Sequence, residues 1–117
     1  MTDKAPAQLA DDAAEAIRAL NHRTRSPQAD WEYPGDAYDV VGNLSTLAMR
    51  LPQLLEQIAN HIKALEDADH LKSDKHQLDA DLVATYDGLT IAAGAAETLR
   101  GALDRAHGGL SSIAYKD

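Results

Sequence analysis

The sequence predicts an all-α protein whose second and third helices form a long antiparallel hairpin within a dimeric helical bundle. Apolar residues recur at intervals of three and four in three separate segments, which is the spacing of an amphipathic helix. No segment alternates polar and apolar residues as a half-buried strand does. In the third segment the spacing is sustained over five heptads, which favours packing against a partner helix. These patterns predict a single helical domain over residues 1–117.

The first helix is predicted over residues 6–25. Its apolar stripe consists of Leu9, Ala13, Ile17 and Leu20. Acidic residues lie toward its start and arginines toward its end, an arrangement that suits the helix dipole. Ser26 and Pro27 follow, and the helix is expected to stop there because proline removes a backbone donor.

Residues 26–37 are predicted to form a linker of unusual composition. Together with the adjoining Tyr38 they contain three of the five aromatic residues of the chain, the other two being Trp31 and Tyr33. Pro34 and Gly35 indicate a turn. Asp36 follows the turn, where it is expected to cap the next helix.

The second helix is predicted over residues 37–70. Leu44, Leu51, Ile58 and Leu65 recur every seven residues, with Leu47 and Leu54 between them. The stripe is broader than a two-position seam, as in a helix that packs against more than one neighbour. Pro52 lies inside this pattern, so a kink or a break is expected near Arg50.

The third helix is predicted over residues 74–107, followed by a tail of residues 108–117. Asp74 and Gln77 resemble a capping box at its start, and Gly108–Gly109 is expected to end it in the left-handed conformation. Its apolar and small residues alternate at intervals of four and three. They are Leu78, Leu82, Thr85, Leu89, Ala92, Ala96, Leu99, Leu103, Ala106, Leu110 and Ile113.

The unequal helix lengths predict a homodimer. A helix of 34 residues spans about 50 Å, whereas the first helix would cover only about 30 Å of it. The uncovered part of the seam is expected to be buried by a second copy, which gives a four-helix core. The residues expected to form this self-association seam are Leu89, Ala92, Ala96, Leu99 and Leu103.

Composition excludes several classes of function. The chain has 11 basic and 19 acidic residues, so its formal net charge is −8, which argues against direct binding to nucleic acid or to an anionic membrane. It contains no cysteine, so a disulfide scaffold, a thiolate metal site and a cysteine nucleophile are excluded. No segment has the length and hydrophobicity of a membrane span or a secretory signal, and the expected location is the cytoplasm.

The sequence contains no recognisable catalytic or cofactor-binding motif. The five histidines occur without the Glu-x-x-His pairs of a bundle di-metal site, and no serine lies in a nucleophile elbow. No glycine-rich phosphate loop is present. We therefore expect no enzymatic activity, no cofactor and no metal. His61 falls on the apolar phase of the second helix, as a half-buried histidine or a pH-sensitive interface contact.

The linker and the start of the second helix are the best candidates for a partner-binding surface. Aromatic residues are enriched at binding hot spots, and no lysine or arginine occurs between Ser26 and Met49, so a basic protein partner would suit the surface. The candidate residues are Trp31, Tyr33, Asp36, Tyr38 and Asp39. The alternative role for these aromatics is to fold over the end of the bundle and close its core.

The favoured function is a non-enzymatic interaction or regulatory module that binds protein through its helix seam and linker. The alternative is an acidic inhibitor, antitoxin-like or DNA-mimicking, that occupies a basic site on a DNA-handling partner. Its acidic helix faces would include Asp79, Asp81, Asp87 and Glu97.

Two stretches carry a resemblance to known proteins. They are Trp31–Leu44, which reads WEYPGDAYDVVGNL, and Arg50–Ile58, which reads RLPQLLEQI. Both are similar to small helical proteins of actinobacteria that are often encoded on mobile elements. The resemblance implies an all-helical fold and transfers no functional residue.

Overall fold

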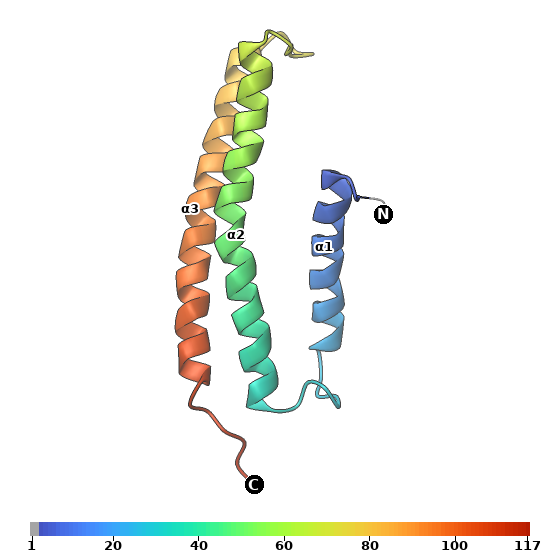
Figure 1. The fold of residues 1–117 in the computed structure, drawn as a ribbon, viewed down its shortest axis with the longest axis vertical. Helices are drawn as coiled ribbons and strands as arrows, with labels where there is room; N and C mark the ends of the chain where they lie inside the picture. The colour runs from blue at the N-terminus through green and yellow to red at the C-terminus, as the bar shows by residue number, and fades with distance from the viewer. Residues whose placement is uncertain (1–2) are drawn as a thin grey trace.

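A computed structural model describes residues 3–117, which form three α-helices. They are α1 (Pro6–Arg23), α2 (Pro34–Asp67) and α3 (Leu78–Leu110). Figure 1 shows α2 and α3 side by side and antiparallel along their whole length, with α1 next to the lower part of α2. The prediction of an all-α chain with a long antiparallel hairpin is confirmed.

The molecule is elongated and leaves much of its surface exposed. Its principal extents are 65 × 33 × 28 Å, and its radius of gyration is 19.2 Å, against about 13 Å for a compact chain of this length. Its accessible surface is 9088 Å², whereas a compact monomer of this mass exposes about 6,200 Å². Within residues 3–117, only three apolar residues are buried: Ala48, Leu82 and Ala96.

The α2–α3 interface follows a regular heptad pattern on both helices. Every position in this register is buried or half-buried. On α2 the positions are Tyr38, Val41, Ser45, Ala48, Pro52, Leu55, Ala59, Ile62 and Glu66; on α3 they are Leu82, Tyr86, Leu89, Ala93, Ala96, Arg100, Leu103, His107 and Leu110. The deepest positions hold small side chains, so the two helices approach each other closely.

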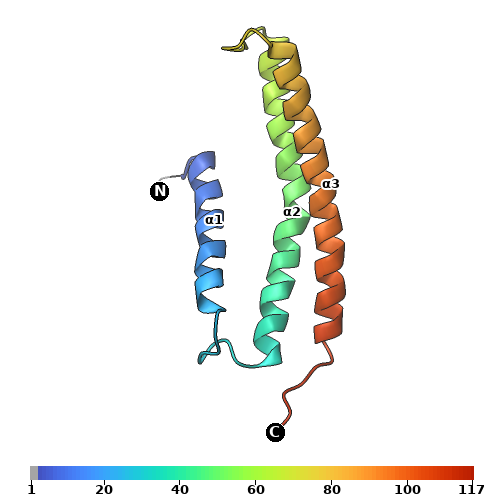
Figure 2. The same cartoon turned by 180° about the vertical axis from the view of Figure 1, so that it is seen from behind.

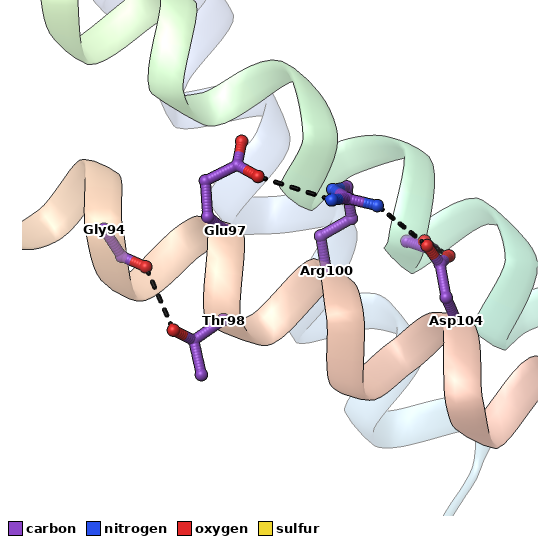
Figure 3. A network of polar contacts seen from close by, with 6 residues as sticks. Gly94, Glu97, Thr98, Arg100 and Asp104 are labelled. Carbon is purple, nitrogen blue, oxygen red and sulfur yellow. Dashed lines mark hydrogen bonds and ion pairs between the residues drawn. The ribbon is translucent and has the colours of Figure 1, made fainter.

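Hydrogen bonds join α2 to α3, and further polar contacts lie within α3. The Ser45 hydroxyl donates to the Asp104 carboxylate across the interface. Figure 3 shows the guanidinium of Arg100 between two carboxylates of its own helix, at 2.9 Å from Asp104 and 3.4 Å from Glu97. Toward the hairpin turn, the Tyr86 hydroxyl donates to Glu66 of α2 at 2.8 Å. Burial, and then this bond, raise the pKa of Tyr86.

An aromatic stack closes the other end of the hairpin. The rings of Tyr38 and His107 lie 3.9 Å apart between centroids and are inclined by 22°. Gly42 makes room for the histidine, because a Cβ at this position would lie 2.9 Å from Nε2 of His107. Tyr38 therefore belongs to the hairpin interface.

The start of α2 differs from the prediction. The helix begins at Pro34, and its cap residue is Tyr33 rather than Asp36. The Asp36 carboxylate instead accepts the backbone N–H groups of Glu32 and Tyr33, each at 3.0 Å. These two bonds lower the pKa of Asp36. The aspartate still satisfies the helix start, but from the third helical position.

The helix α2 continues through Pro52, so the alternative of a break near Arg50 is wrong. In Figures 1 and 2 the hairpin bows gently along its length instead of dividing at the proline. Proline has no backbone N–H to donate to the carbonyl of Ala48, and α2 tolerates the loss of this one hydrogen bond without ending.

The ends of α3 also correct the prediction. The cap residue is Gln77, and Asp74 does not cap the helix. The carboxylate at this end is Asp81, which accepts from Ser73 at 2.7 Å and Gln77 at 2.8 Å; both bonds lower its pKa. The helix then runs through Gly108–Gly109 to Leu110, and none of the glycines in residues 3–117 has a positive φ.

Candidate protein-interaction surface

A second apolar stripe runs along α2 beside the one that faces α3. Its positions are Val40, Leu44, Leu47, Leu51, Leu54, Ile58, His61 and Leu65, again at intervals of four and three. Leu47, Leu54 and Ile58 remain 38, 48 and 40% exposed. This helix therefore presents two interfaces, of which only the first is fully used within the chain.

The helix α1 covers the second stripe in part. Four of its residues, Ala13, Ala16, Ile17 and Leu20, line a groove of about 280 Å³ against Val40, Asn43, Leu44 and Leu47 of α2. No Cα atom of α1 lies within 8 Å of a Cα atom in either hairpin helix. Leu9, nearer the start of α1, is 56% exposed. The helix thus lies against the hairpin without close packing.

The α3 helix extends the apolar surface on the same side of the hairpin. A hairpin interface has two flanks, and on one of them Pro52 and Glu56 of α2 share a pocket with Thr90 and Ala93 of α3. The second stripe of α2 lies on the other flank. The α3 residues on that flank are exposed and uncharged: Thr85, Gly88, Ala92, Ala95, Leu99, Ala102 and Ala106.

We call the two adjoining stripes the hairpin apolar face. It comprises the second stripe of α2, from Val40 to Leu65, together with the α3 stripe from Thr85 to Ala106. No position in either stripe carries a formal charge. Around it, residues 40–62 include only Arg50 and Glu56 as charged side chains, and residues 82–96 only Asp87. Exposed apolar surface of this extent is typical of a binding site.

The predicted self-association seam divides between two surfaces. Ala96 is buried, and Leu89 and Leu103 are half-buried in the register that packs on α2. Ala92 and Leu99 are exposed and belong to the hairpin apolar face. The contribution of α2 to this face was indicated in the sequence only by the breadth of its stripe.

The five candidate residues in and after the linker also separate. Asp36 satisfies backbone groups at the helix start, and Tyr38 stacks on His107. Trp31 is half-buried and pairs with Gln28 through two backbone hydrogen bonds of 3.0 and 3.2 Å. Tyr33 is 49% exposed, and Asp39 is also exposed. Only Trp31, Tyr33 and Asp39 are therefore available at the surface.

The titratable residues show no site for a metal within residues 3–117, where no three His, Asp or Glu side chains come together as ligands. His61 is exposed rather than half-buried, and it interrupts the apolar stripe of α2. The described helices are each too short or too polar to cross a membrane.

Comparison with known proteins gives no relative. No protein-family model matches the chain, and neither the curated proteins nor the solved structures include a significant match. The resemblance of residues 31–58 to small actinobacterial proteins therefore stays a prediction.

Proposed function

We propose that this chain is a non-enzymatic protein–protein interaction module that pairs with a second copy of itself through the hairpin apolar face. The observation that carries the proposal is an exposed, uncharged surface shared by two long helices. Charged residues are depleted from the centres of protein interfaces, as they are here. The pairing buries the face in a core of four helices.

The exposed area supports an interface of the required size. The accessible surface exceeds that of a compact monomer by about 2,900 Å² for each copy. Stable interfaces bury about 1,200–2,000 Å² in total, and obligate homodimers bury more. Two copies therefore have enough surplus surface, even if α1 keeps covering part of it.

The shapes of the two stripes favour a second copy as the occupant. The α2 stripe consists mainly of leucines, such as Leu51 and Leu54, whereas the α3 stripe consists mainly of alanine and glycine. A two-fold axis parallel to the hairpin would place α2 of each copy over α3 of the other. Large side chains would then meet small ones, and every neighbouring pair of helices would be antiparallel.

The linker supplies a second, smaller surface for a further partner. Trp31, Tyr33 and Asp39 are accessible there, and Glu32 adds another carboxylate. A partner with basic side chains would complement this end of the molecule.

The acidic-mimic alternative has weaker support. Asp81 is engaged by Ser73 and Gln77, and Glu97 is paired with Arg100. With about 100° between successive residues, Asp81 points away from the side of α3 that carries Asp79, Asp87 and Glu97. At about 1.5 Å per residue those three carboxylates are about 12 and 15 Å apart along the axis, which is too sparse to imitate a row of DNA phosphates.

The test is the solution mass of the protein and of two glutamate variants. Light scattering after size-exclusion chromatography should give twice the chain mass of 12.6 kDa. Leu54→Glu should shift the mass to that of one chain, because it places a charge in the proposed core. The matched control is Val83→Glu, at a residue of α3 that is 59% exposed and lies off the face.

Circular dichroism must show that both variants remain helical. A native protein that stays monomeric over a wide concentration range would refute self-association. Equal dissociation by Val83→Glu would refute the assignment to this face.

A further inference from the structure

A pocket of about 450 Å³ lies where the linker, the start of α2 and the C-terminal tail meet. Three of the five aromatic residues of the chain line it: Trp31, Tyr33 and Tyr115. Its volume falls in the range of about 300–1,000 Å³ that small-ligand pockets occupy. Tyr115 lies in the tail beyond α3, so this pocket joins segments that are distant in the sequence.

The walls of the pocket are fixed by hydrogen bonds and ring contacts. The Asp36 carboxylate holds the backbone N–H groups of Glu32 and Tyr33 at 3.0 Å. Gln28 and Trp31 hold the loop before them through a reciprocal backbone pair. The rings of Tyr33 and Tyr115 meet edge to face, with centroids 5.0 Å apart and an inclination of 75°. The aromatic walls are thus formed before any ligand enters.

The lining suits a cationic organic group. Aromatic faces attract cations, and rings that meet at a steep angle enclose a quaternary ammonium well. Glu32 also lines the pocket and forms no ion pair with any residue that the structure describes. The one cation in the lining, Arg25, directs its guanidinium to Nδ1 of His22 at 2.8 Å.

We propose that this pocket binds an alkylammonium group, such as the head of choline or the side chain of trimethylated lysine. The site is separate from the hairpin apolar face, and the proposal does not depend on self-association. Glu32 supplies the counter-charge, while the three rings provide an apolar and polarisable surface for the methyl groups.

Trp31 is the only tryptophan in the chain, so its fluorescence reports on the pocket directly. Titration with choline and with N-acetyl-trimethyllysine amide should change the emission in a saturable manner. The neutral isostere 3,3-dimethylbutan-1-ol should bind at least about three-fold more weakly, because it lacks the cation–π attraction. A saturable response to either ammonium probe above the isostere supports the site.

Two variants assign the response to the pocket. Tyr115→Ala removes one wall outside the helices and should weaken choline binding by about three-fold. The matched control is Ile113→Ala, at an exposed residue of the same tail that does not line the pocket. Glu32→Gln should also weaken binding and leave the isostere unaffected. Equal responses to choline and the isostere, or no response to either ammonium probe, would overturn the proposal.

Discussion

The two surfaces of α2 are both apolar heptad stripes, yet only one of them forms a closely packed interface. The stripe that faces α3 contains Ser45, Ala48 and Ala59, and small residues such as Ala93 and Ala96 lie opposite it. The stripe that faces α1 consists of larger leucines and leaves a groove of about 280 Å³. Close approach therefore follows from small side chains in register and polar contacts across the interface, rather than from hydrophobicity alone.

The sharpest way to test this comparison is to add the same volume to each surface. Ala48 is fully buried, so Ala48→Leu should lower the free energy of unfolding by about 1–3 kcal/mol through overpacking. Ala16→Leu extends into the groove between α1 and α2 and should be neutral or stabilising. Urea denaturation at one protein concentration measures both. Equal losses would show that the two surfaces are packed alike.

Replacing glycines is expected to give the next largest change in stability. Gly101→Ala, outside the hairpin apolar face, should stabilise the protein by up to about 1 kcal/mol, because its Cβ would meet nothing within 4 Å and alanine favours the helix. Gly42→Ala should gain none of this, since its Cβ would displace His107 from the stack with Tyr38. Adding His107→Ala to Gly42→Ala should recover the helix-propensity gain. Thermal unfolding of the three variants tests the order, and a gain of equal size at both glycines would contradict it.

The hydrogen bond across the hairpin has a smaller expected effect. Ser45→Ala removes the donor to Asp104 and should cost about 1 kcal/mol of unfolding free energy. Thr98→Ala is the matched control, because its hydroxyl bonds only to the Gly94 carbonyl of its own helix (Figure 3). Chemical denaturation should show no comparable loss for Thr98→Ala. If both variants behaved alike, the interhelical bond would contribute nothing.

The carboxylates at the helix starts set the acid dependence. The pKa values of Asp36 and Asp81 are lowered from 3.8 by hydrogen bonds made in the folded state. Their contribution to the stability of the folded state is therefore present above pH 3.8 and is lost as the pH falls through the lowered pKa values. Asp36→Asn and Asp81→Asn should make the urea midpoint fall less steeply at acid pH, whereas Asp39→Asn should leave its pH dependence unchanged. An unaltered pH dependence in the first two variants would rule out these carboxylates as its cause.

Helix existence could be predicted from apolar spacing, whereas the phase of α3 could not. Thr85, Ala92, Leu99 and Ala106 continue the apolar period, but the structure places Tyr86, Ala93, Arg100 and His107 in the interface. Tyr86 and His107 are accommodated there because Tyr86 bonds to Glu66 and His107 stacks on Tyr38. The interface stripe is thus the more polar of the two stripes on α3, so apolar spacing alone indicated the other one.

Part of the candidate interaction surface could also be predicted from the sequence. The breadth of the α2 stripe indicated a second neighbour, and the linker aromatics indicated a surface. The part played by Tyr115 could not be predicted, because its contact with Tyr33 depends on the path of the tail. The helix ends differed from the prediction because Asp36 acts from the third helical position and because Gly108–Gly109 lie within α3, which continues to Leu110.

The loose seating of α1 also determines how the protein opens. Isolated helices shorter than about 12–15 residues are marginal in water, and α1, with 18 residues, is only slightly longer and has few tertiary contacts to stabilise it. Its amide hydrogens should therefore exchange with solvent through local detachment, in a unit separate from the hairpin. The hairpin amides should exchange only when the whole α2–α3 unit opens. This chain thus consists of two cooperative units of unequal protection, joined by the loop of residues 24–33.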